Sequence, residues 1–304
     1  MAVSDRPPAQ GIAGHPPGAG RSDRVPPVAL VLAGVTSIQF GAAIAATMFA
    51  DLGPAGTSLL RLGFAAAILY ALWRPAVGGR SRADLRLVVA FGLALGAMNL
   101  CFYEALDRIP LGIAVTIEFA GPLAVAVAYS RRRLDGLWVL LAAAGIVLLA
   151  DPGGARSIDA IGLLYALVAA AFWGIYIVLA ARAGPRFRGS EGVALAMLVA
   201  AVVPIVPGIV QGGADLLKPE FLAVGVAVGV LSSVVPYSLE TEALRRMPTN
   251  VFGVLMSLEP AVAALAGFVV LGQSLSVREL LAIALVVVAS VGATRYATVA
   301  PVDA

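Results

Sequence analysis

Long apolar segments recur along nearly the whole chain, and this pattern restricts its fold more than any other feature. A helix needs about 20 apolar residues to cross the hydrocarbon core of a bilayer. The mean hydropathy of +0.95 and the 13% share of charged residues exclude an ordinary soluble domain of 304 residues. We therefore predict an all-α integral membrane protein with ten transmembrane helices. The predicted spans are 28–49, 54–73, 86–106, 111–130, 135–150, 158–181, 190–210, 219–240, 249–271 and 277–297.

The residue types that support catalysis or metal binding are nearly absent from these spans. The only histidine is His15, in a Pro- and Gly-rich leader, so no membrane-embedded histidine can form a Ser–His pair or a metal site. Lys218 is the only lysine and follows no glycine-rich loop, which excludes a Walker A nucleotide site. The single Cys101 cannot form an intramolecular disulfide. We therefore expect neither an enzyme nor a bound cofactor or metal.

The basic residues are distributed unequally between the two sides of the predicted membrane. The pI near 9.3 does not indicate nucleic-acid binding, because the arginines lie in short loops between apolar spans. With ten spans and a cytoplasmic N-terminus, 16 Lys and Arg residues fall on the cytoplasmic side and 4 outside. This bias predicts a multi-pass protein of the cell (inner or plasma) membrane, with both termini in the cytoplasm.

The two halves of the chain carry the same short motif. Glu104–Pro110 (EALDRIP) matches Glu242–Pro248 (EALRRMP) at a shift of 138 residues, and the same shift maps Pro122 onto Pro260. Each half holds five spans, so the motifs face opposite sides, as in the inverted repeats of many secondary transporters. The predicted units are a disordered cytoplasmic tail (1–27), two inverted five-helix repeats (28–150 and 158–297) and a cytoplasmic C-terminal tail (298–304).

Two glutamates, Glu118 and Glu259, lie inside predicted spans that are otherwise almost wholly apolar. An ionisable group in hydrocarbon costs roughly 2.5–3.5 kcal/mol on insertion scales, so it usually faces a cavity and has a function. Each acid precedes a proline, Pro122 or Pro260, which interrupts the backbone bonding of its helix. A carboxyl group in such surroundings can exchange a proton near neutral pH. We predict that both acids couple transport to protons; the alternative is a neutral Glu that bridges two helices.

Arg61 lies in the early part of the second predicted span. One interpretation makes its guanidinium the counter-charge for a substrate carboxylate or for one of the two glutamates. The alternative is that the side chain extends to the outer surface, because Arg61 is only about two helical turns from Pro54. The residues alone leave both interpretations open.

Aromatic and polar residues cluster in the helices near the acids. Aromatic faces can hold an ammonium group, and Tyr hydroxyls and amides provide hydrogen bonds. For Tyr103 and Tyr237, near span ends, the alternative is anchoring at the membrane interface, whereas Trp173 lies in mid-span, where anchoring explains it poorly. The predicted substrate-binding residues are Trp173, Tyr176, Tyr237, Asn99, Tyr103, Gln39 and Arg61.

Three further glutamates lie at or near span ends. Glu104 precedes Arg108 by four residues and Glu242 precedes Arg246 by four, a spacing typical of ion pairs on one helix face. We expect a stabilising role for both pairs. Glu240 has no such partner at that spacing, which keeps a functional role open for it.

Three strings of residues resemble the drug/metabolite transporter superfamily, in particular the threonine/homoserine exporter subgroup of its EamA-type ten-helix branch. They are Ile109–Ala126 (IPLGIAVTIEFAGPLAVA), Pro236–Glu240 (PYSLE) and Phe252–Ala261 (FGVLMSLEPA). The similarity covers roughly residues 28–297, and the Arg-, Pro- and Gly-rich leader departs from the short N-terminus usual in the group. The resemblance implies a proton-coupled exporter of small amino acids, with Glu118 and Glu259 at the positions of its intramembrane acids.

The leading hypothesis is therefore an antiporter that exports threonine, homoserine or related metabolites in exchange for protons. The alternative is an exporter of the same fold for cationic drugs, nucleosides or other metabolites, because membrane carboxylates can bind cations as readily as they exchange protons. The expected partners are a small-molecule substrate, protons and the lipid bilayer, with no nucleic acid. The sequence leaves a homodimer open.

Overall fold

A computed structural model describes residues 25–75, 78–129, 134–150, 159–187 and 190–295. The predicted tails fall almost wholly outside these ranges, as do Arg131, Arg132 and Arg133. The elements are α1 (Pro27–Ala46), α2 (Phe49–Trp73), α3 (Arg82–Leu106), α4 (Leu111–Glu118), α5 (Ala120–Ala128), α6 (Asp135–Ala150), α7 (Ala160–Ala183), η2 (Gly184–Arg186), α8 (Glu191–Ala200), α9 (Ile205–Gly212), η3 (Gly213–Leu217), α10 (Pro219–Gly229), η4 (Val230–Val234), α11 (Val235–Leu244), α12 (Thr249–Met256), α13 (Glu259–Leu271) and α14 (Val277–Arg295).

The described residues are helical, and most of the helices are apolar enough to cross a membrane. Eight pass by length and hydropathy, or nine if the pair Glu191–Ala200 and Ile205–Leu217, bent by 51°, counts as one span. The shorter apolar helix Gly136–Leu149 occupies the fifth predicted span. All ten predicted spans thus contain helix, although crossing by the bent pair and by the short helix remains a prediction.

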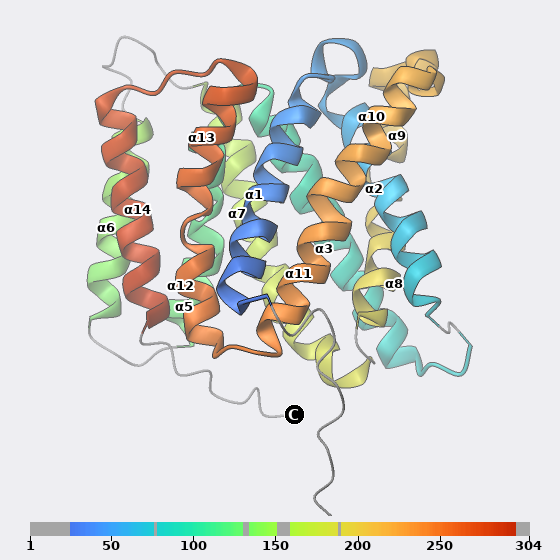
Figure 1. Cartoon of the computed structure of the whole chain (residues 1–304), viewed down its shortest axis with the longest axis horizontal. Helices are drawn as coiled ribbons and strands as arrows, with labels where there is room; N and C mark the ends of the chain where they lie inside the picture. The colour runs from blue at the N-terminus through green and yellow to red at the C-terminus, as the bar shows by residue number, and fades with distance from the viewer. Residues whose placement is uncertain (1–24, 76–77, 130–133, 151–158, 188–189, 296–304) are drawn as a thin grey trace, which may run out of the picture.

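The helices form one bundle with two end faces (Figure 1). We call one end the N-terminal face: α1 begins there at Pro27, α11 ends there at Leu244, and α14 ends there at Arg295. At the opposite face α1 ends at Ala46 and α13 ends at Leu271. Large apolar side chains such as Val206 and Val210 point outward and are 72% and 79% exposed. Such a surface suits lipid, which removes the need for an apolar exterior to be covered by protein.

Contacts between the first and second halves come in matching pairs. Helix α3 packs on α7, while α1 packs on the segment α10–η4–α11. Helices α4 and α5 pack on α7, while α12 and α13 pack on α1. The contacts of α2 with α8 and α9, of α6 with α14 and of α4 with α13 each join equivalent spans of the two halves.

Two spans are broken in the middle, and a proline explains each break. Pro122 has no N–H to bond the carbonyl of Glu118, and α4 ends at that residue. Pro260 likewise leaves the carbonyl of Met256 without its usual donor, and α12 ends there. Helices α4 and α12 have eight residues each, and the shift of 138 residues maps the bounds of one onto those of the other.

A third proline opens the backbone of the span α10–η4–α11. The turn Val230–Val234 has π-helical bonding, in which the N–H of Val235 bonds the carbonyl of Val230, and Pro236 has no N–H to give. The carbonyls of Leu231 and Ser232 are thereby left to other donors. Ser37 Oγ donates to Leu231 O at 2.7 Å, and Arg61 Nη2 donates to Ser232 O at 3.0 Å. The π-helical turn is thus held by side chains of α1 and α2.

The largest buried apolar cluster lies toward the opposite face. Its members include Phe49 at the start of α2, Tyr103 near the end of α3, and Leu111, Ile113 and Ile117 of α4. The part of the bundle between this cluster and the N-terminal face contains a cavity.

Candidate functional site

A cavity of about 510 Å³ extends from the N-terminal face into the middle of the bundle. Its rim includes Leu244 at the end of α11, Thr249 and Asn250 at the start of α12, and Thr294 near the end of α14. Deeper walls come from α1–α5 and α7 of the bundle. The volume lies within the roughly 300–1,000 Å³ of ordinary small-molecule sites, so the cavity can hold a compact metabolite.

Glu118 and Glu259 both line this cavity, one at the end of α4 and the other at the start of α13. The helix breaks made by Pro122 and Pro260 therefore place the two acids at the free ends of half-helices. Glu118 is 7% exposed and Glu259 4%. Gln39 Nε2 donates to Glu259 Oε2 at 3.4 Å, while no hydrogen bond or ion pair with a described residue holds Glu118. Both carboxyl groups are thus buried with little support from protein partners.

Arg61 lies in the middle of α2 and lines the same cavity. It is only 4% exposed, so the interpretation that it extends to the outer surface is wrong. Its Nη2 bonds Ser232 O, its Nε has no hydrogen-bond partner, and its charge acts on Glu118 without forming an ion pair. A buried guanidinium without a carboxylate partner is costly, which makes it a strong site for an anionic group.

Tyr103 lies behind Arg61 and does not line the cavity. The guanidinium carbon is 5.3 Å from the centroid of the Tyr103 ring, and the side chain is fully buried against Phe49 and Phe102. Interfacial anchoring is therefore wrong for Tyr103. Its hydroxyl has no hydrogen-bond partner among the described residues, which fits a supporting position and not direct contact with a ligand.

The other predicted binding residues all reach the cavity wall. Trp173 meets the edge of Phe119 at 5.0 Å between ring centroids, with the two rings nearly perpendicular. Tyr176 and Tyr237 pack on the same small buried cluster. Asn99 Nδ2 donates to Leu95 O at 2.8 Å, which fixes the amide on α3. The cavity-lining residues among those predicted are Gln39, Arg61, Asn99, Glu118, Trp173, Tyr176, Tyr237 and Glu259.

Glu240 adds a third carboxylate to the cavity. It is half-buried on α11, and no hydrogen bond or ion pair with a described residue holds it. The sequence had left its role open. The three carboxylates do not form a metal site, since no group of three His, Cys, Asp or Glu side chains among the described residues could hold a metal ion. The wall therefore carries three acids and one guanidinium.

Sequence reasoning missed the aromatic residues Phe102, Phe119 and Phe252 of the wall, and the backbone oxygen of Ser232. The three phenylalanines carry no signal in an apolar span. Ser232 did carry one, because it stands four residues before Pro236 and its carbonyl must find a different donor.

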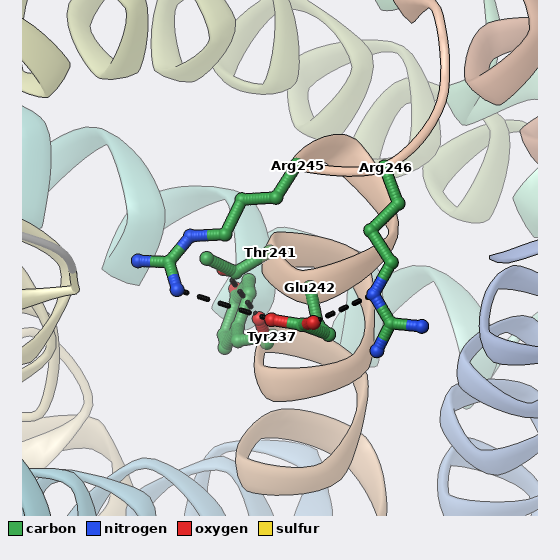
Figure 2. Close-up of polar contacts among 5 residues, drawn as sticks. All are labelled: Tyr237, Thr241, Glu242, Arg245 and Arg246. Carbon is green, nitrogen blue, oxygen red and sulfur yellow. Dashed lines mark hydrogen bonds and ion pairs between the residues drawn. The ribbon is translucent and has the colours of Figure 1, made fainter. Parts of the chain in front are cut away.

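The two copies of the repeated motif form different contacts. Glu242 accepts a hydrogen bond from Arg246 Nε at 2.7 Å and lies 3.8 Å from Arg245 Nη1, as Figure 2 shows. This pair confirms the expectation for the second motif. The expectation for the first is wrong: Glu104 accepts instead from Gln211 Nε2 at 3.2 Å, and Arg108 lies over the ring of Tyr165.

The opposite face is closed by side chains of the second half that bond the backbone of the first. Gln211 Oε1 accepts from Ala55 N at 2.7 Å, next to the kink at Gly53 and Pro54. Gln273 Oε1 accepts from Leu111 N at 3.0 Å, where α4 begins. We call these two contacts the glutamine clasps. Together with the large apolar cluster, they separate the cavity from the opposite face.

Comparisons with known proteins agree with this architecture. The profile of the EamA-like transporter family matches residues 160–295. The threonine/homoserine exporter RhtA of Salmonella typhimurium is 42% identical over 269 residues, which cover 88% of this chain and 91% of the relative. RhtA of Escherichia coli K12 is 41% identical over the same shares. A solved crystal structure with 22% identity aligns with a TM-score of 0.61 over 88% of this chain and 97% of its own, which supports the fold alone.

Proposed function

The chain belongs to the EamA-like transporter family, and we propose that it exports small zwitterionic amino acids, such as threonine and homoserine, in exchange for protons. The family assignment places it among transporters and not among enzymes. The apolar helices and the exporter relatives make it a multi-pass membrane protein. The proposed cargo follows the relatives, which are named threonine/homoserine exporters, and the chemistry of the cavity.

The observation that carries the proposal is that unpaired charges of both signs line one cavity. Arg61 has no carboxylate partner, and Glu118 has no cationic one, although the charge of Arg61 acts on it. A zwitterion placed between them would give its carboxylate to Arg61 and its ammonium group to Glu118. Both buried charges would then be paired, which offsets part of the cost of keeping them out of water.

A purely cationic cargo fits this wall less well. A lipophilic cation could bind the three carboxylates and the aromatic rings, but it would leave the guanidinium of Arg61 unpaired. Transport of cationic drugs or other metabolites therefore remains the second candidate, without an observation that favours it.

The proposed proton carriers are Glu118 and Glu259. Each sits at a helix break, where the two half-helices can move relative to each other and change the surroundings of the carboxyl group. An acid exchanges protons between two sides only if its protonation changes as access changes. The helix breaks provide a structural reason for such a change.

Ten spans in two inverted repeats are part of the same proposal. The paired contacts between the halves support it, as do the matching bounds of α4 and α12. The bias of basic residues supports a cytoplasmic position for the N-terminal face and for both termini. In this arrangement the cavity is open to the cytoplasm, where an exporter collects its substrate.

Transport of radiolabelled threonine and homoserine into inside-out vesicles, with and without a pH gradient, tests the proposal. We expect the gradient to drive transport, and Glu118→Gln or Glu259→Gln to abolish that component, because an amide cannot release a proton. At least one of the two variants should retain exchange of labelled for unlabelled substrate. Glu220→Gln, on the exposed first turn of α10, is the matched control.

Arg61→Lys separates the two candidate cargoes. Lysine keeps the charge but lacks the planar fork that binds a carboxylate with two bonds, so threonine transport should weaken. Transport of a lipophilic cation should not change in this variant. Full gradient-driven threonine transport in both glutamine variants would contradict the role of the two acids, and transport of cations alone would contradict the proposed cargo.

A further inference from the structure

Glu240 is the cavity carboxylate that neither the zwitterion nor the proposed proton exchange needs. It faces the cavity from α11, and its Cγ would lie 3.7 Å from a methyl group placed on Gly34 of α1. This is an ordinary contact distance, so the side chain of Glu240 lies next to α1. Glu240 has no hydrogen-bond or ion-pair partner among the described residues, and its charge acts on Glu259 and on Tyr237.

The position of Glu240 along its helix fixes its separation from the guanidinium of Arg61. Arg61 bonds the carbonyl of Ser232, and Glu240 follows eight residues later in the same span, about 12 Å along the axis at the rise of an α-helix. The carbonyl of Ser232 points toward the C-terminus of the helix, and the side chain of Glu240 leans toward the N-terminus. The carbonyl oxygen and the carboxylate are therefore closer together than the separation along the axis. Several ångströms therefore remain between the two charged groups.

An α-amino acid bound to Arg61 by its carboxylate cannot reach Glu240 with its α-ammonium group. That nitrogen is two bonds from the carboxylate carbon, about 2.5 Å away at standard bond lengths. A second amino group at the end of a side chain of four carbons is five bonds beyond the α-carbon, about 6 Å in an extended chain. A terminal amine on a side chain of three or four carbons is long enough to span several ångströms, and the α-ammonium group is not.

The surroundings of Glu240 also suit an ammonium group. Tyr237 lies one helical turn before it, and Tyr176 of α7 packs on the same cluster as Tyr237. A carboxylate beside aromatic rings is a common arrangement for binding organic ammonium ions. Three acids against one guanidinium leave the cavity with more negative than positive side chains, even after a zwitterion has bound.

We propose that the cavity also accepts linear diamino acids, whose second ammonium group binds Glu240 while the carboxylate binds Arg61. This inference rests on the proposed function, because it places the α-amino acid moiety in the same site as threonine. It adds a substrate class, namely amino acids with a terminal amine on a chain of about three or four carbons.

Counterflow in reconstituted vesicles tests the inference, with radiolabelled threonine, lysine and ornithine and with norleucine as a neutral analogue of lysine. In the wild type we expect transport of lysine and ornithine, and lysine should compete with threonine better than norleucine does. In Glu240→Gln the ratio of lysine to threonine transport should fall about tenfold, as expected for the loss of one charged hydrogen bond. Glu240→Asp keeps the charge and should restore part of the ratio.

Glu242→Gln is the matched control on the same helix. Glu242 pairs with Arg246 outside the cavity (Figure 2), so its loss should leave the lysine-to-threonine ratio unchanged. The ratio is independent of how much folded protein each variant yields. Wild-type protein that moves threonine but not lysine overturns the inference and leaves the proposed function intact, as does an unchanged ratio in Glu240→Gln. Absence of threonine transport would instead overturn the proposed function.

Discussion

Helices α4 and α12 occupy matching positions in the two halves of the chain, yet their surroundings differ completely. All eight residues of α4 are buried, whereas none of the eight residues of α12 is. Helix α4 packs on α13, α7 and α3, while α12 contributes Phe252 and Met256 to the wall of the open cavity. The same segment of the repeat therefore closes one face and borders the opening at the other.

Under the proposed inverted repeat, this difference makes the structure one of two related states. In an inverted repeat the two halves can exchange conformations, so that the packed helix becomes the exposed one and the reverse. We therefore propose that the whole of α4, and not only its C-terminal part, borders the cavity when it opens to the opposite face, and that α12 is then buried.

The largest effect is expected from filling the space beside α4. A methyl group at Gly112 would lie 2.9 Å from Cα and Cβ of Ala264 in α13, too close for normal contact. We expect Gly112→Ala to destabilise the protein by roughly 1–3 kcal/mol, the usual cost of overpacking. The midpoint of thermal unfolding in detergent measures this change.

Asn250 of α12 is the matched control, because the shift of 138 residues maps Gly112 onto it. Its side chain is exposed at the rim of the cavity. Asn250→Ala should change stability by less than about 0.5 kcal/mol, as for most exposed substitutions. Equal destabilisation by the two alanines would contradict the described difference in packing.

A smaller effect is expected at the glutamine clasp of the closed face. Gln211→Leu removes the acceptor of Ala55 N and the donor to Glu104. An unpaired backbone N–H in a partly buried position should cost about 1 kcal/mol, at the lower end of the range for unsatisfied groups. Thermal unfolding of the variant, compared with wild type, gives the value.

The second copy of the motif should respond least. Glu242→Gln breaks a half-exposed pair within one helix, and such pairs contribute about 0.2–1 kcal/mol, less at high salt. If Glu242→Gln lowered the stability as much as Gln211→Leu does, the N-terminal face would be held by its ion pair as strongly as the opposite face is held by the glutamine clasp. That result would contradict the described difference between the two faces.

The sequence predicted the parts of the site that depend on local chemistry. Glu118 and Glu259 stand out because carboxylates in apolar spans are costly, and Pro122 and Pro260 mark the breaks beside them. The bounds of the spans followed from hydropathy, and α6 begins and ends at the predicted residues.

The errors concern residues whose partners are distant in the chain. Glu104 was expected to pair with Arg108 but bonds Gln211, 107 residues away. Arg61 could not be placed, because the carbonyl that it binds is freed by Pro236 in the other half. The contrast between α4 and α12 was equally hidden, because LGIAVTIE and TNVFGVLM are both apolar and packing alone distinguishes them.

Labelling of matched cysteines tests the central claim, that α4 closes one face while α12 borders the opening at the other. With Cys101 replaced by alanine, single cysteines at Ala114 and Phe252 occupy equivalent positions, because the shift of 138 residues relates them. Ala114 is fully buried, and Phe252 lines the cavity. A membrane-impermeant maleimide in sided vesicles reports which cysteine is accessible, and from which side.

We predict that the cysteine at 252 reacts from the cytoplasmic side at least about tenfold faster than the one at 114, a difference of about 1.4 kcal/mol in accessibility. Excess threonine should slow this reaction by occupying the cavity. Equal reaction of the two cysteines, or reaction of the cysteine at 252 from the external side alone, would contradict the account.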